Sequence, residues 1–240
     1  FASLNLENHA PQPRFSLAQP LAKTAVLAEA VNDNPPTPQA SGDLYLYKLA
    51  SRIDLKAGET KKVTLHEQED FKTTRKLVHS FPATWGQQNS EGQVIHPRIE
   101  LAFKNATDHP LAQGIVRFYQ TDKNANTQFI GEDQMSHHSQ GDEIKLYPGQ
   151  SFDVSLKQTQ TAYEVLDKTR YKATYEVLIE NKGQKTETVR FSDNFPNNWV
   201  LIESSVRPSQ TVGNQMTYEV MVKPAQKTTI GYSVEITTRP

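Results

Sequence analysis

Apolar and polar residues alternate with a period of two over much of this chain from residue 43 onward. The clearest example is RIELAFKN, residues 98–105, in which Ile99, Leu101 and Phe103 share one face and the charged residues between them share the other. Such alternation is typical of an antiparallel strand that buries one face and turns the other to water. The pattern therefore predicts a protein built of β-strands.

A recurring turn pattern separates these strands. It has the form L-x-x-G-[EQ]-[TS]-x-x-V-[TS]-L in residues 55–65 and 146–156, with a looser copy in residues 222–232. Each copy predicts the end of one strand, a tight turn and the start of the next strand. We expect bends at Gly58 and at Pro148–Gly149, while the third copy has Ala225 at the glycine position.

Further strands are predicted on both sides of the middle copy. Before it, they cover residues 44–49, 75–81, the neighbourhood of Trp85, and 114–120 paired with 128–133 as a hairpin. After it, they cover residues 170–181, 188–193, 194–205, 214–224 and 228–237, with Trp199 as the expected core anchor. The later strands are short and regularly spaced, which is typical of an immunoglobulin-like sandwich, although the Cys-Trp-Cys pattern of true immunoglobulin domains is missing.

A change in composition at residues 157–169 marks the expected boundary between two domains. We expect an all-β fold of two antiparallel β-sandwich-like domains, residues 43–158 and 159–240, the second being immunoglobulin-like. Residues 1–42 are rich in proline, alanine and asparagine, which predicts a tether that resists regular structure. Residues 20–31 within it are either a linker with a transient helix or a short helix docked on the first sheet.

Length, charge and cysteine content exclude several classes of protein. The chain has 240 residues, enough to bury one or two cores, and a net charge of −1, which gives no long-range field to collect nucleic acid. No run approaches the roughly 18 apolar residues of a membrane span. The absence of cysteine excludes disulfides, thiolate metal sites and a cysteine nucleophile. Because the chain starts at Phe1 without a leader, we expect it to be a mature or trimmed piece of a longer protein.

An ordered series of segments carries a resemblance to a bacterial family. The segments are residues 41–65, RIELAFKN, PLAQGIVRFYQTDKNANTQFIGED, GDEIKLYPGQSFDV and residues 175–205. Together they resemble the DUF4139 family, some members of which are described as mucoidy-inhibitor-like, over roughly residues 43 to 240. The chain departs from the expected pattern in having PLAQG for PLPAG and in ending with TTRP. The resemblance implies an exported bacterial protein with a further N-terminal β-rich portion, and it supplies no catalytic or binding positions.

Two clusters of histidine and acidic residues are candidates for a metal site. The HEQED cluster, residues 66–70, is predicted at a strand end without a second histidine at helical spacing, so a solvated acidic loop is favoured there. His137 and His138, with Glu132 and Asp133 nearby, form the better candidate. Neighbouring residues of a strand point to opposite faces, so both histidines could bind one ion only from a loop. An exposed hairpin connection is the favoured interpretation, and we expect no cofactor.

Aromatic residues supply candidates for ligand binding. Tyr45 and Tyr47 alternate with leucines, which gives a tyrosine-lined face that either packs against a second layer or forms a platform for sugar rings. Trp85 lies in a loop rich in glycine and glutamine and is either a cap on a binding surface or a core residue. We favour packing for the tyrosines and leave both interpretations open for the tryptophan.

Catalytic and phosphate-binding motifs are absent from the sequence. There is no G-x-S-x-G elbow, no P-loop and no G-x-G-x-x-G, and pairs of carboxylates such as Glu100 with Glu132 occur too widely to be informative. Basic residues lie opposite acidic ones on the predicted strand faces. We therefore expect Arg98, Lys104 and Arg117 to form cross-strand pairs and not a phosphate track.

These observations favour a non-catalytic, exported bacterial envelope or secreted protein, located in the periplasm, on the outer surface or outside the cell. Its sheets would present loops or an exposed edge strand to a protein or polysaccharide partner, and nucleic acid is not expected as a partner. One alternative is a carbohydrate-binding module that uses Trp85, Tyr45 and Tyr47. The other is a cell-envelope glycan hydrolase, with its site in a missing N-terminal part or around Glu132, Asp133 and His138.

Overall fold

The computed structural model describes residues 2–7, 38–41, 44–47, 52, 54, 56–60, 70–82, 92–196 and 198–237, with the strands before residue 50 described by their backbone alone. Strands are the only regular elements in these ranges, which confirms the predicted all-β fold. No helix in this part of the chain could span a membrane.

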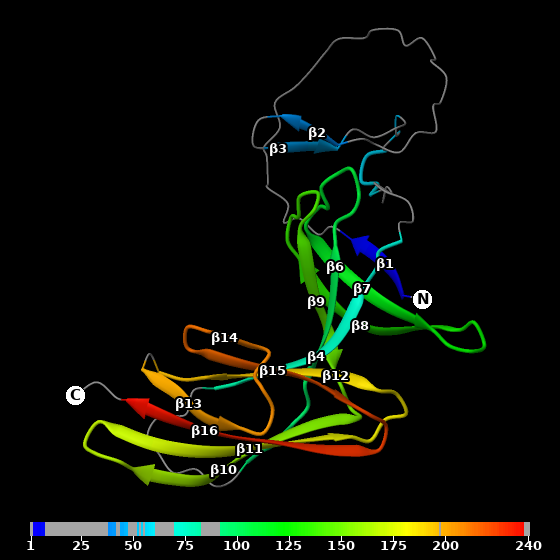
Figure 1. Cartoon of the computed structure of the whole chain (residues 1–240). Helices are drawn as coiled ribbons and strands as arrows, with labels where there is room; N and C mark the ends of the chain where they lie inside the picture. Colours follow the sequence, from blue (N-terminus) through cyan, green and yellow to red (C-terminus); the bar gives the residue numbers. More distant parts are fainter. Residues whose placement is uncertain are drawn as a thin grey trace.

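Two large sheets form the body of the molecule (Figure 1). The six-stranded sheet has the order β14 (Gln210–Val212), β15 (Gln215–Val222), β12 (Glu187–Asn194), β4 (Thr74–Phe81), β6 (Arg98–Lys104) and β9 (Glu143–Gln150). The five-stranded sheet has the order β13 (Trp199–Ser204), β16 (Gln226–Thr237), β11 (Arg170–Asn181), β10 (Val154–Val165) and β5 (Val94–Ile95). All pairs in both sheets are antiparallel except β4 with β12, which is parallel.

Two smaller sheets complete the described structure. The three-stranded sheet has the order β1 (Ala2–Glu7), β7 (Gly114–Thr121) and β8 (Thr127–Met135), in which β7 and β8 form the predicted hairpin. The two-stranded sheet pairs β2 (Pro38–Ser41) with β3 (Leu44–Tyr47). Both β1 and β2 fall inside the segment predicted to resist regular structure. The backbone of β1 pairs with β7, and that of β2 pairs with β3. Local amino-acid composition does not predict such pairing.

The first core lies between the five-stranded sheet and the β4–β12–β15 part of the six-stranded sheet. Alternate residues of β11 are all buried, as predicted: Tyr171, Ala173, Tyr175, Val177 and Ile179. Alternate residues of β16 are buried in the same way: Ile230, Tyr232, Val234 and Ile236. Trp199 is half-buried at the margin of this core, with its ring centroid 4.7 Å from that of Phe195. It therefore packs against the core, as expected, from the edge strand β13.

A second core lies at the other end of the six-stranded sheet, between β6, β9 and the β7–β8 hairpin. Its buried members are Phe103, Leu111, Val116, Phe118, Met135, Ile144 and Leu146. Figure 1 shows β6 and β9 running from the large sandwich up to β1, β7 and β8. One sheet therefore contributes to both cores.

Strand β6 joins the two cores directly. Ile99 packs against the first core, whereas Leu101 and Phe103 belong to the second, so the three residues predicted to share one face do so. The boundary predicted at residues 158–159 falls inside β10, which pairs with β11 up to Val165. Strand pairing between β4 and β12 crosses the predicted boundary as well, because sheets form from strands that are distant in sequence.

The three copies of the turn pattern fold differently. Gly58 has a φ of 79° and lies in a turn closed by the Glu59 amide donating to the Lys56 carbonyl at 3.0 Å, as predicted. The prediction of a bend at Pro148–Gly149 is wrong, because both residues lie inside β9. Pro148 has no N–H to offer the ladder, and the β6–β9 pairing is irregular at this point, where such a residue is tolerated. The chain bends instead at residues 151–153.

Candidate functional site

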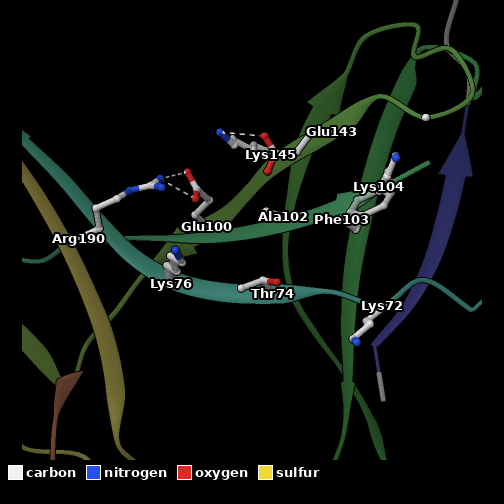
Figure 2. Close-up of a pocket in the computed structure, with 11 residues that line it drawn as sticks. Lys72, Thr74, Lys76, Glu100, Ala102, Phe103, Lys104, Glu143, Lys145 and Arg190 are labelled. Carbon is white, nitrogen blue, oxygen red and sulfur yellow. Dashed lines mark hydrogen bonds and ion pairs between the residues drawn. The ribbon is translucent and has the colours of Figure 1, made fainter. Parts of the chain in front are cut away.

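A groove of about 450 Å³ opens on the outer face of the six-stranded sheet, and Figure 2 shows the side chains that line it. Its lining is formed by Lys72, Thr74, Lys76, Glu100, Ala102, Phe103, Lys104, Gly141, Glu143, Lys145 and Arg190. The register of the strands brings these residues together, since Thr74 lies opposite Ala102, and Ala102 lies opposite Lys145. The groove therefore crosses β4, β6 and β9.

Small side chains create the hollow. Ala102 occupies the middle strand of the three, between Thr74 on β4 and Lys145 on β9. The nearest residues of β6 on the same face as Ala102 have long side chains: Glu100 on one side and Lys104 on the other. A methyl group flanked by long charged side chains leaves a depression whose rim is charged.

The inner end of the groove is fixed by an ion pair in which the carboxylate is buried and the guanidinium is partly exposed. Nη2 of Arg190 donates to both carboxylate oxygens of Glu100, at 2.6 and 2.7 Å, and the Tyr147 hydroxyl donates to Oε2 at 3.1 Å. Glu100 is only 3% exposed, although the alternation of β6 predicts a solvated side chain at this position. Burial of a carboxylate is tolerated when a charged donor and a further hydrogen bond compensate it, as here.

Tyr147 is held in place by a second cation. The guanidinium carbon of Arg98 lies 3.9 Å from the centre of the Tyr147 ring, within the range of a cation–π contact. Burial and the neighbouring Glu100 carboxylate raise the pKa of Tyr147, so the hydroxyl stays protonated and can donate to that carboxylate. Among the described residues, Arg98 therefore makes an aromatic contact in place of the expected cross-strand ion pair.

Two further ion pairs lie along the groove. Nζ of Lys76 donates to both carboxylate oxygens of Glu219 on β15 at 2.9 Å, so this pair passes over β12. Lys145 lies 3.3 Å from Glu143 two residues earlier on β9. Both pairs are more exposed than the Arg190 pair, and each contributes little to folding because water screens it.

Lys72 and Lys104 are different, because neither has an acidic partner in the part of the chain that the structure describes. Both are exposed, and Figure 2 shows them toward the end of the groove opposite Arg190. The cross-strand pair predicted for Lys104 is therefore not formed among these residues, although the one predicted for Arg117 is, with Glu132 at 3.3 Å. The groove thus has an excess of positive charge that its own acidic residues leave unneutralised.

The four residues proposed for a metal site lie apart from this groove and make separate contacts. Glu132 pairs with Arg117, and Asp133 accepts the backbone N–H groups of Gln134 and Tyr147 at 2.9 and 2.7 Å. Nδ1 of His137 accepts the amide of Gln113 at 3.3 Å, and His138 lies 3.9 Å from Asp142. In the ranges that the structure covers, no three histidine or acidic side chains come together as a potential metal site.

The other candidates add no second site. Trp85 and the HEQED cluster up to Glu69 lie outside the described residues, as do residues 20–31. Tyr45 and Tyr47 lie on β3 as predicted, but their side chains are outside the description. The residues named for a hydrolase, Glu132, Asp133 and His138, have the separate partners given above and are not brought together.

A polar cluster inside the first core was not predicted. Strand β12 turns Val189, Phe191 and Asp193 inward, and both oxygens of Asp193 accept Nε2 of Gln158, at 2.9 and 2.7 Å. The same nitrogen donates to the Tyr232 hydroxyl at 2.9 Å. Burial raises the pKa of Asp193 to about 7, because the interior disfavours the charged form. This cluster is enclosed between the sheets, so it belongs to the packing of the core.

Comparisons of the chain with protein-family models, with curated proteins and with solved structures gave no match. The signal of the groove in the sequence is a set of lysines on three separate segments, and that signal becomes informative only when the order of the strands is known.

Proposed function

We propose that this chain is a non-catalytic binding module that engages a protein or polysaccharide partner of the bacterial envelope through the basic groove. The proposal depends most on one observation: Lys72 and Lys104 are exposed beside the groove and have no acidic partner among the described residues. Side chains that form no ion pair with the residues described here remain available for a ligand.

The arrangement of the groove favours binding over catalysis. Both acidic residues in its lining are paired with cations, Glu100 with Arg190 and Glu143 with Lys145. A general acid or base must instead be free to exchange a proton with a substrate. The groove therefore offers positive charge at a fixed position and no group prepared for proton transfer.

The same proposal includes the resemblance to the DUF4139 family and a periplasmic, outer-surface or secreted location. It also includes an immunoglobulin-like character for residues 159–240. Support for this last point comes from the strands of this segment, which lie in both large sheets and turn alternate residues into the first core between them. Fractionation of cells that express the full-length protein tests the location, and recovery only in the cytoplasm would contradict it.

A retention experiment tests the binding function. The full chain is immobilised and exposed to solubilised bacterial envelope, in parallel with a Lys72→Ala/Lys104→Ala variant. A matched control removes Lys182 and Lys227, which are equally charged but pair with Glu180 on the five-stranded sheet. We expect the wild-type chain and the control to retain the same envelope component and the groove variant to lose it. Equal retention by all three proteins would contradict the proposal.

A further inference from the structure

We infer that the ligand of the groove is an acidic polysaccharide, recognised through the carboxylates of its uronate residues. This inference deepens the proposed function and depends on it, since it names the class of ligand for the same groove.

The charge of the groove calls for an anion. Its lining holds five cations and two acids, and Glu219 adjoins it through Lys76. Three of the five cations are paired, and Lys72 and Lys104 have no acidic partner within the ranges that the structure describes. The whole chain has a net charge of −1, so this positive excess is local to the groove. An approaching anion is therefore attracted to this surface.

The shape of the groove favours a chain-like ligand. A pocket for a small molecule usually encloses most of its ligand and is lined by apolar and aromatic groups. This groove lies open on a sheet face and is lined almost wholly by charged and small side chains. Its lining extends over the three adjacent strands β4, β6 and β9, so a polymer can lie along it and place successive charges near Lys72 and Lys104.

The side chains that line the groove argue against two other classes of ligand, single-stranded nucleic acid and protein. Single-stranded nucleic acid is usually held by exposed aromatic side chains on which its bases stack, and the aromatic residue that lines this groove, Phe103, is buried. A protein partner would need an apolar centre of contact, and the lining offers only Ala102 besides Phe103. A hydrophilic chain with regularly repeated carboxylates needs neither exposed aromatic side chains nor an apolar centre of contact.

Lysine also suits a carboxylated polymer. An ammonium group is a compact point charge with rotatable donors, so it accepts anions approaching from different directions. The one guanidinium in the groove, that of Arg190, is already committed to Glu100. No lining residue therefore has a guanidinium available to donate two parallel hydrogen bonds to one phosphate or sulfate group. An anion in the groove is contacted by the ammonium groups of single lysines instead.

Titration of the full chain with labelled polygalacturonate tests this inference, with neutral dextran, dextran sulfate, polyglutamate and duplex DNA as comparators. We expect polygalacturonate to bind most tightly, and its affinity to fall by about tenfold or more between about 50 and about 300 mM salt. Lys72→Ala/Lys104→Ala should weaken binding by about tenfold, while Lys182→Ala/Lys227→Ala leaves it unchanged. Ala102→Leu, which fills the hollow without changing charge, should weaken it as well, with circular dichroism confirming that the variant is folded.

The outcomes separate the inference from the function on which it depends. Equal or tighter binding of dextran sulfate, polyglutamate or DNA would overturn the assignment to a uronate polymer, as would binding that the lysine substitutions leave unchanged. If the chain retains an envelope component through Lys72 and Lys104 but binds no polygalacturonate, the inference fails and the proposed function stands. If retention does not depend on the lysines either, both fail.

Discussion

Arg190 and Glu100 are joined across an intervening strand: the guanidinium on β12 reaches over β4 to the carboxylate on β6, with both contacts between 2.6 and 2.7 Å. Lys76 on β4 reaches in the opposite direction over β12 to Glu219 on β15. Each ion pair spans one intervening strand, so together they link the four adjacent strands β15, β12, β4 and β6.

The buried pair is expected to matter far more for stability than the exposed one. Substitution of Arg190 by methionine leaves the Glu100 carboxylate buried with only the Tyr147 hydroxyl, and we expect a loss of about 2 to 3 kcal/mol in the free energy of unfolding. Lys76→Met, the matched control in the exposed pair, should cost about 0.5 kcal/mol or less. Denaturant titrations of Arg190→Met, of Glu100→Gln and of the double variant measure the coupling energy between Arg190 and Glu100. Equal costs for Arg190→Met and Lys76→Met would contradict the different burial of the two pairs.

Gly131 allows β8 to approach β9 closely. Its φ is +155°, and a Cβ built at this position would lie 1.9 Å from the Pro148 carbonyl oxygen. Gly131→Ala forces one of the two backbones to move, so we expect a loss of about 2 kcal/mol or more in thermal or chemical unfolding. Gly149, next to Pro148, is the control, because a Cβ there meets nothing within 4 Å. A Gly131→Ala protein as stable as Gly149→Ala would show that the two strands do not approach in this way.

Ala225 occupies a turn position that favours glycine. Its φ is +53°, in the left-handed region, and the Gln226 amide donates to the Lys223 carbonyl at 3.3 Å to close the turn. Ala225→Gly should stabilise the protein by about 0.5 to 1 kcal/mol, since relief of backbone strain exceeds the added entropy of the unfolded chain. In the strand β10, Ala162→Gly should destabilise by a similar amount. Melting temperatures that move in the same direction for both variants would disprove this account of the turn.

Asp193 is expected to make stability dependent on pH. The unfolded chain releases the proton of this carboxyl near pH 4, whereas the folded protein keeps it up to about pH 7. Between these values the folded state binds more protons, so stability falls as pH rises, by up to about 1.4 kcal/mol per pH unit for this group. Asp193→Asn imitates the protonated form and should remove this slope. Unfolding curves from about pH 4 to about pH 8 measure it, and an unchanged slope in the variant would show that Asp193 is not its source.

The local pattern of the sequence predicts strands and their buried faces well, because side chains on a strand alternate whatever the strand pairs with. Buried positions on β11 and β16 follow directly from that rule. The turn at Pro148–Gly149 was misplaced because the irregular pairing of β9 with β6 determines how the chain runs there, and that depends on a segment about 50 residues earlier.

The groove could not be predicted for the same reason. Glu100 meets Arg190 across 90 positions of sequence, so nothing near β6 indicates that this carboxylate is buried. The parallel pairing of Val189 with Leu77 brings β12 beside β4 and thereby sets Arg190 at the groove. Ala102 is an ordinary small residue in the sequence, and it becomes the floor of a hollow only when its neighbours on β4 and β9 are known.

The most direct test of the account is a map of backbone amide chemical shifts of the full chain during titration with polygalacturonate. We predict that the shifts concentrate on residues 72–76, 100–104 and 141–145, which line the groove, while the amides of β10, β11 and β16 stay unchanged. Shifts concentrated on the five-stranded sheet, or an unchanged spectrum at saturating polymer, would contradict the claim that the outer face of the six-stranded sheet is the binding surface.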